Sequence, residues 1–223
     1  MTAPVHVERP LLLVRHGRTA ANASGLLLGR HDPPLDERGE RDVASLGRTI
    51  ASGRFGPIAA VVTSPLRRTC QTGDAIRAAL DEQGSSDAGP DELQRLDAID
   101  DRLVELDYGD FDGVAISDVD AETWRRWRSD PTFAPPGGES LVELGVRVRS
   151  ACLDWCAAEV PAGTIVLVSH VSPIKAAVAW ALGVGDEVAW RTHLDTASIS
   201  RIVERQGTPS LTSFNDTGHL LGE

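Results

Sequence analysis

The chain has 223 residues, of which 41% are hydrophobic, and its formal net charge is −11. That length and composition suit a single α/β domain with a proper hydrophobic core. Because the balance is acidic and no segment forms a basic tract, nucleic acid and acidic membrane surfaces are poor partners.

The N-terminal residues, the apolar stretches and the cysteines indicate the cellular compartment. The first ten residues lack the charged-then-apolar layout of a signal peptide. No apolar stretch approaches the roughly 20 residues of a membrane span. Three cysteines, an odd number, provide no disulfide framework. We therefore expect a soluble, cytoplasmic protein.

The first predicted unit is a short buried strand over residues 11–14, followed at once by Arg15 and His16. A guanidinium beside an imidazole at the end of a buried strand is costly to build for packing alone. It is expected where a site must bind an anion and attack it. A Gly- and Pro-rich loop over residues 26–35 then leads into a helix predicted over residues 36–52.

The second unit repeats this layout. An apolar strand is predicted over residues 58–63, and Ser64-Pro65 is typical of a helix N-cap followed by proline at the first helical position. The helix is predicted over residues 65–80. Arg67 and Arg68 lie in its first turn, where cations oppose the helix dipole. Their presence indicates that something negative binds at this helix start.

The middle of the chain predicts shorter elements. They are a flexible turn over residues 83–90, a short strand over 103–106, a helix over 122–128 ended by Pro131, a rigid loop over 135–138 and a long helix over 141–159 capped by Ser140. The segment WRRWR, residues 124–128, fits two roles: a lid that contacts substrate, or a half-buried amphipathic turn. We favour the second.

The third unit has a strand over residues 165–168, His170 directly after it, and a helix opened by Ser172-Pro173. Alternating strands and helices predict an α/β fold with a mostly parallel central sheet and helices on both faces. Ligands of such sheets bind beyond the carboxyl ends of the strands, where helix N-termini also present amides to anions. If the three strands are neighbours, two arginines and two histidines converge on one pocket: Arg15, His16, Arg68 and His170. Such a pocket fits a phosphoryl group.

Five motifs in order give the chain a family resemblance: RHGRTAAN, TSPLRRTCQTG, LVELDYGDFDG, PGGES and SHVSPIKA. From Leu11 to Leu220 the chain resembles the histidine phosphatase superfamily, also called phosphoglycerate-mutase-like. The resemblance implies that fold, as one histidine phosphatase domain over residues 1–223. SHVSPIK and the NDTGHL ending are most similar to the acid phosphatase and α-ribazole phosphatase type, and to the phosphatase half of actinobacterial proteins that also carry a ribonuclease H.

The resemblance implies a role for each site residue. His16 is the expected nucleophile and forms a phosphohistidine, while Arg15, Arg68 and His170 hold the phosphoryl oxygens. His170 is expected to be cationic when phosphate is bound. Asn22 is expected to bond a phosphate oxygen, with a simple turn role as the alternative.

Two further positions complete the expected site. Gly29 is expected to let backbone amides approach the phosphate. Glu105 is the expected general acid and base, because it aligns with the family's Leu-x-Glu-x-x-x-Gly pattern; its rivals are Asp107, Asp110 and Asp112. Arg67 falls between the family positions and is expected to be a solvated helix residue.

Other features are expected to be structural. They are a hairpin of residues 197–203 and 210–214 around Gln206-Gly207, core packing of Cys152 and Cys156, an ion pair of Glu139 with Arg147, and a C-terminal clasp formed by NDTGHL.

The sequence therefore predicts a phosphomonoesterase that hydrolyses a small phosphorylated metabolite. No cofactor is expected, no cluster has metal-ligand spacing, and a homodimer is possible. One alternative is a bisphosphoglycerate-dependent phosphoglycerate mutase. Mutases usually carry Glu-Arg-His-Tyr-Gly and a longer basic insertion, whereas this chain has Glu-Leu-Asp-Tyr-Gly over residues 105–109 and lacks the insertion. A second alternative is a non-catalytic binder of phosphorylated ligands.

Overall fold

The structure is a computed structural model, and it describes residues 9–84 and 95–221. Its strands are β1 (Leu11–Arg15), β2 (Ile58–Thr63), β3 (Leu96–Ile99), β4 (Thr164–Ser169), β5 (Ile199–Arg205) and β6 (Thr208–Asp216). Its helices are α1 (Ala20–Ala23), α2 (Glu37–Ala51), α3 (Arg67–Gly84), α4 (Ala121–Ser129), α5 (Leu141–Cys156) and α6 (Val171–Leu182).

The strands form one sheet in the order β3-β2-β4-β1-β5-β6. The first four run parallel to one another, β5 is antiparallel to β1, and β6 is antiparallel to β5. The predicted mostly parallel sheet is therefore confirmed. Arg15 lies opposite Ser169 and Thr63 lies opposite Val168. The carboxyl ends of β1, β4 and β2 therefore lie side by side at one end of the sheet.

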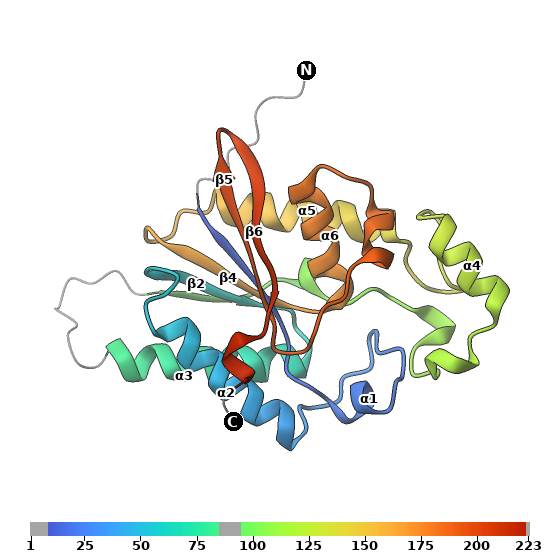
Figure 1. The fold of residues 1–223 in the computed structure, drawn as a ribbon, viewed down its shortest axis with the longest axis horizontal. Coiled ribbons are helices and arrows are strands. Elements are labelled where there is room, and N and C mark those ends of the chain that lie inside the picture. The colour runs from blue at the N-terminus through green and yellow to red at the C-terminus, as the bar shows by residue number, and fades with distance from the viewer. Residues whose placement is uncertain (1–8, 85–94, 222–223) are drawn as a thin grey trace.

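Helices cover both faces of the sheet, as predicted (Figure 1). Alternate strand residues face opposite sides. One set, which includes Leu13 and Leu167, packs under α5 and α6, and the other, which includes Val14 and Val168, packs under α2 and α3. Because both faces are buried over β1, β2 and β4, these three parallel strands are largely apolar.

The C-terminal hairpin follows the predicted pattern. Strands β5 and β6 are joined at Gln206 and Gly207, whose φ angles are 55° and 75°. Positive φ at both central residues is the conformation of a type I′ turn, whose twist matches that of the flanking strands. The NDTGHL ending continues from β6 into a short 3₁₀ turn, Gly218–Leu220.

The strand predicted over residues 103–106 was wrong. That stretch begins in a 3₁₀ turn, Asp101–Leu103, and continues as extended chain without sheet partners among the described residues. The strand that pairs with β2 is instead β3, which the sequence did not reveal. Its residues are mostly exposed because it forms the sheet edge, so the apolar run that predicts a buried strand is missing.

Two helix starts were also misplaced. Helix α3 begins at Arg67 rather than at Pro65, and Ser64 is engaged by the ring of His170 instead of capping the helix. Helix α6 begins at Val171 with His170 as its N-cap, ahead of the predicted Ser172-Pro173 start.

The remaining boundaries are close to the predicted ones. Asp36 and Asp120 cap α2 and α4, and Ser140 caps α5 in a reciprocal capping box. Helix α5 ends three residues earlier than predicted, at Cys156. The turn predicted over residues 83–90 lies largely outside the described residues. Within the described ranges, none of the helices combines the length and the apolar character needed to cross a membrane.

Candidate active site

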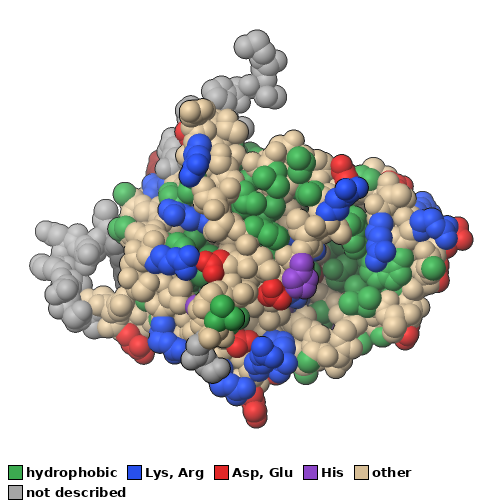
Figure 2. Space-filling model, in the orientation of Figure 1, with side chains coloured by type: hydrophobic (Ala, Val, Ile, Leu, Met, Phe, Trp, Pro, Cys, Tyr) green, Lys and Arg blue, Asp and Glu red, His purple; other side chains and the backbone are tan. Residues whose placement is uncertain are grey.

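A pocket of about 340 Å³ lies beyond the carboxyl ends of β1 and β4. In the space-filling view the molecular face is hollowed at the right of centre, with hydrophobic side chains around the hollow (Figure 2). The pocket is lined by Arg15, His16, Arg18, Asn22, Gly25, Leu26, Leu27, Leu28, Glu105, Tyr108, Ile116, Val171, His193, Leu194, Asp195 and Thr196. Three of the predicted catalytic residues therefore share one cavity: Arg15, His16 and Glu105.

His16 is almost fully buried, and its ring has a defined tautomer. Its Nδ1 lies 2.7 Å from the carbonyl oxygen of Gly17. A carbonyl only accepts, so Nδ1 carries the proton and donates it, which leaves Nε2 with a free lone pair. Burial, and then the charges of Arg68 and Arg15, hold the pKa of His16 well below its ordinary value. The imidazole is therefore neutral at pH 7 and nucleophilic through Nε2.

His170 stands behind His16, with ring centroids 5.1 Å apart. Its Nδ1 accepts from Arg68 Nε at 3.2 Å, so its ring proton is on Nε2, which donates to Ser64 Oγ at 2.8 Å. Burial, followed by the charge of Arg68, lowers the pKa of His170 well below 6.5. In this structure His170 is thus a neutral imidazole; the cationic form expected with bound phosphate stays a prediction.

Arg68 is fully buried, and all of its guanidinium nitrogens are occupied. Besides His170, it donates to the carbonyl of His31 at 2.7 Å and to that of Gly29 at 2.9 Å. Neither Arg68 nor His170 belongs to the pocket lining. The structure places both next to His16, but direct contact of Arg68 with a phosphoryl group stays a prediction, since it requires an exchange of partners.

Arg15 has unused donor capacity. One of its terminal nitrogens donates to the carbonyl of Leu194, while its Nε is buried with no hydrogen-bond partner among residues 9–84 and 95–221. Burial lowers the pKa of Arg15, although a guanidinium remains charged at any physiological pH. A buried cation with a free donor beside His16 is a site for an anion.

Glu105 is the candidate carboxyl group that lies in the pocket; Asp107, Asp110 and Asp112 are not part of its lining. Its Oε1 accepts from the amides of Leu106 at 2.7 Å and Ser172 at 3.3 Å. Burial raises the pKa of Glu105 against these hydrogen bonds and the charge of Arg68. A raised pKa lets the carboxyl group hold its proton to a higher pH than a free glutamate does, as a general acid requires.

Arg147 holds the segment that carries Glu105. Its guanidinium donates to the carbonyls of Arg102, Val104 and Glu105 at 2.6, 2.8 and 3.2 Å. It also forms a two-point ion pair with Glu139 at 2.7 and 2.8 Å. The predicted ion pair is confirmed, and it positions an extended segment that no strand partner holds among the described residues.

Asp112 was treated only as a rival acid by sequence reasoning, yet it organises the loop at the site. Its carboxylate accepts from three consecutive backbone amides: Gly29 at 2.8 Å, Arg30 at 2.7 Å and His31 at 2.9 Å. This is a backbone anion nest filled by a carboxylate of the protein. The carbonyls of the same loop hold Arg68. The expected approach of the Gly29 amide to phosphate stays a prediction, since that amide is engaged here.

A backbone amide at the start of α3 is also bound by a carboxylate of the protein itself. Asp32 Oδ1 accepts from the amide of Arg67 at 2.6 Å. The negative group inferred from two arginines at this helix start is, in this structure, a carboxylate of the chain itself. The Arg67 side chain is exposed, as predicted.

Asn22 lines the pocket, but its Oδ1 accepts from the amide and hydroxyl of Thr19 in the capping box of α1. The turn role is therefore confirmed, and a bond from Asn22 to phosphate stays a prediction. Cys152 and Cys156 are buried in the core, and the WRRWR segment is an amphipathic helix. Within that helix Trp127 is fully buried and Trp124 stacks on it at 5.5 Å.

Sequence reasoning missed the loop of residues 193–197, which forms one wall of the pocket. The Ala197 amide donates to the carbonyl of His16 at 3.0 Å, and the Ala197 carbonyl contacts His219 Nε2 at 2.9 Å. The predicted C-terminal clasp is thus present and grips this loop. No motif marked the loop, because its role depends on a contact with a segment 22 residues away.

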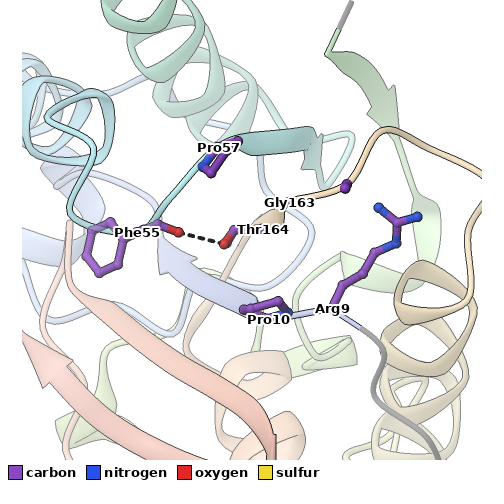
Figure 3. Close-up of a pocket in the computed structure, with 7 residues that line it drawn as sticks. Arg9, Pro10, Phe55, Pro57, Gly163 and Thr164 are labelled. Atoms are coloured by element: carbon purple, nitrogen blue, oxygen red, sulfur yellow. Dashed lines mark hydrogen bonds between the residues drawn. The ribbon is translucent and has the colours of Figure 1, made fainter. Parts of the chain in front are cut away.

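Elsewhere the chain offers less chemistry. A hollow of about 390 Å³ lies at the other end of the sheet, where β1, β2 and β4 begin. There Thr164 Oγ1 donates to the carbonyl of Phe55 at 2.8 Å (Figure 3). Its one cation, Arg9, donates to carbonyls of residues 160 and 161. Across residues 9–84 and 95–221, no group of three or more His, Cys, Asp or Glu side chains could hold a metal ion.

Comparisons with known proteins agree with this geometry. Residues 11–217 match the family model of the histidine phosphatase superfamily, branch 1. The bifunctional protein Rv2228c of Mycobacterium tuberculosis is 38% identical over 216 residues, which cover 94% of this chain and 54% of that protein. The chain thus spans about half the length of this relative.

Two other similarities bear on the chemistry. A probable phosphoglycerate mutase, GpmB of Yersinia enterocolitica, is 34% identical, with 94% of each chain covered. The structure of a putative α-ribazole-5′-phosphate phosphatase from Escherichia coli superimposes with a TM-score of 0.73 at 26% identity, covering 94% of this chain and 97% of that one.

The nest formed by Asp112 gives a first prediction. In Asp112→Asn the acceptor charge is lost and an amide group faces three N–H donors. Hydrogen bonds to a charged group are worth about 1.5–3 kcal/mol, so the free energy of unfolding should fall by an amount in that range. Urea unfolding measures it, with Asp110→Asn as the exposed neighbouring control. An Asp112→Asn protein as stable as that control would contradict the role.

The buried histidines give a second prediction. Their folded pKa values lie below the roughly 6.5 of an unfolded histidine. As pH falls through that value, the unfolded chain therefore binds protons that the folded chain rejects. Stability present above about pH 6.5 is lost as pH falls, by up to about 1.4 kcal/mol per pH unit for one histidine.

The raised pKa of Glu105 makes the unfolding free energy change with pH in the opposite direction. The test therefore compares the slope of the wild-type protein with that of a variant. Between pH 7.5 and 5.5, His170→Asn should lower the slope of unfolding free energy against pH. Equal slopes in the two proteins would show that burial of His170 does not control its protonation.

Proposed function

The chain belongs to branch 1 of the histidine phosphatase superfamily, and on that premise we propose that it is a phosphomonoesterase acting on a small phosphorylated metabolite. The observation that carries the proposal is the state of His16. Its protonated Nδ1 donates to the Gly17 carbonyl, the lone pair of its Nε2 has no hydrogen-bond partner within the described residues, and Arg15 offers a buried cation beside it.

In the first step His16 Nε2 attacks the phosphorus atom of the ester. The P–N bond forms as the bond from phosphorus to the alcohol oxygen breaks. Arg15 stabilises the charge on the oxygens of the transferred group, where positioned cations contribute most to phosphoryl transfer. Glu105, whose pKa is raised by burial, gives its proton to the leaving alkoxide, and the product alcohol departs neutral.

The second step regenerates the enzyme. Glu105, now a carboxylate, takes a proton from water as the water oxygen attacks phosphorus. The P–N bond breaks, its electron pair returns to His16 Nε2, and inorganic phosphate leaves. One carboxyl group thus serves as acid and then as base.

The mutase alternative rests on the similarity to GpmB. A mutase must return the phosphoryl group to a second hydroxyl of a bound carboxylate substrate. In this pocket Arg18 is already paired with Asp36 at 2.9 Å, and a leucine, Leu106, stands where mutases usually carry arginine. These features favour transfer to water. Interconversion of 3- and 2-phosphoglycerate in the presence of bisphosphoglycerate would favour the mutase instead.

Phosphoenzyme trapping tests the nucleophile. A rapid acid-free quench with ³²P-labelled p-nitrophenyl phosphate should label the wild-type protein through a bond that is stable to base and labile to acid. His16→Ala should take up no label. His170→Asn, which alters the adjacent buried histidine, should still be labelled at a lower rate. Label retained by His16→Ala and lost from His170→Asn would transfer the nucleophile to His170.

The leaving group tests the acid. Protonation matters where a strongly basic alkoxide departs, so Glu105→Gln should slow single turnover of alkyl phosphates by about 10²–10⁴-fold. It should slow p-nitrophenyl phosphate much less. Asp107→Asn, the matched change outside the pocket lining, should show no such dependence, and Arg15→Ala should slow both esters alike.

The contrary outcome is equally specific. If Glu105→Gln slows both esters by the same factor while Asp107→Asn is selective for alkyl phosphates, then Asp107 is the acid.

A further inference from the structure

The outer part of the pocket contains a negative charge that the chemistry above does not use. Asp195 lines the cavity, and its side chain is 51% exposed. The other charged group beyond the reacting centre, Arg18, is neutralised by Asp36 at 2.9 Å. Outside the reacting centre the pocket therefore presents the carboxylate of Asp195, and its lining also includes the apolar side chains of Leu26, Ile116 and Val171.

Asp195 is held by partners on both of its oxygens. Oδ2 accepts from Asn215 Nδ2 at 2.8 Å, and Oδ1 lies 3.0 Å from His193 Nε2. The Asp195 amide in turn donates to Asn215 Oδ1 at 2.7 Å. The hydrogen bond from Asn215, followed by that from His193, lowers the pKa of Asp195, so the group is a carboxylate at neutral pH.

The loop that carries Asp195 is fixed relative to the nucleophile. The residue before it, Leu194, accepts from Arg15, and the Ala197 amide donates to the His16 carbonyl. Ala197 has a φ of 56° and Asn215 a φ of 54°. A left-handed alanine is strained, and such strain persists where surrounding contacts over-determine the backbone. The carboxylate thus stands at a set place beside the reacting centre.

We propose that Asp195 is a specificity-determining residue of the phosphatase site. It selects phosphomonoesters whose alcohol part carries an ammonium or hydroxyl donor and disfavours those with a second anion near the ester. This inference rests on the proposed function. Like charges brought together at a binding surface are strongly unfavourable, so one carboxylate is sufficient to reject a substrate carboxylate.

The half-exposed oxygens keep room for a donor from substrate. Each carboxylate oxygen has two lone pairs, and the contacts with Asn215 and His193 use one on each. A substrate ammonium or hydroxyl can add a hydrogen bond without displacing either partner. The aliphatic side chains of the pocket lining would cover the carbon chain of the alcohol. The phosphate lies toward Arg15, whose charge offsets the nearby Asp195.

The test compares esters that differ only at the end of the chain. O-Phosphoethanolamine, 2-hydroxyethyl phosphate and 2-phosphoglycolate share two carbons, and the matching three-carbon amine, alcohol and acid extend the series. For the wild-type protein kcat/KM should be at least about tenfold higher for the amine and the alcohol than for the acid. Asp195→Asn should bring these ratios close to one by raising turnover of the acids.

Two variants and one reference substrate separate the effect of the positioned Asp195 charge on these ratios from a general change in charge or activity. Asn215→Gly keeps a residue that tolerates positive φ but frees Asp195, and should give intermediate ratios. Asp74→Asn removes the same charge at a side chain that is 73% exposed on α3, and should keep the wild-type ratios. Each kcat/KM is divided by the value for p-nitrophenyl phosphate, so that a general loss of activity cancels.

The outcomes are distinct. Wild-type protein that turns over p-nitrophenyl phosphate but treats amines and acids alike would overturn the role of Asp195. So would ratios that are the same in Asp195→Asn as in wild type. If folded wild-type protein hydrolyses none of these esters, p-nitrophenyl phosphate included, then the proposed phosphatase function is wrong. The proposed role of Asp195 in substrate selection is then wrong as well.

Discussion

The structure depends on burying two imidazoles against two guanidinium groups. His16 and His170 lie 5.1 Å apart with Arg68 and Arg15 beside them. Desolvation and like charge both oppose protonation there, so each ring is neutral and each of its nitrogens has a defined role. On His16, Nδ1 donates to the Gly17 carbonyl, so the lone pair of Nε2 can attack. On His170, Nδ1 accepts a hydrogen bond from Arg68, so its lone pair cannot attack.

The cations and amides around the pocket are largely satisfied by groups of the chain itself. Arg68 is satisfied by two backbone carbonyls and His170, the loop amides by Asp112, and the start of α3 by Asp32. Each uses a group of the chain where an unpaired buried donor would be costly. Arg15 is the exception, with a buried Nε that has no partner among the described residues. That unmatched donor lies where the reacting group is proposed to bind.

The two halves of the pocket come from different parts of the chain. The proposed reacting centre lies at the ends of β1 and β4, where parallel register brings their carboxyl ends together. The outer wall is a loop held by the C-terminal clasp, through Asn215 and His219. The two parts are tied together, because Leu194 accepts from Arg15 and the Ala197 amide donates to the His16 carbonyl.

The sequence alone determined three of the four parallel strands, the major helices and the residues at the strand ends. Apolar runs, caps and turn residues act over a few positions, so the linear order is sufficient to reveal them. It also identified His16, Arg15 and Glu105, which the fold then placed in one cavity. The tertiary structure alone decided that Asp112 fills the amide nest, that Arg68 faces carbonyls, and that Asp195 lines the pocket. Those roles join residues about 20 to 80 positions apart, and only the folded chain brings such partners within hydrogen-bond distance.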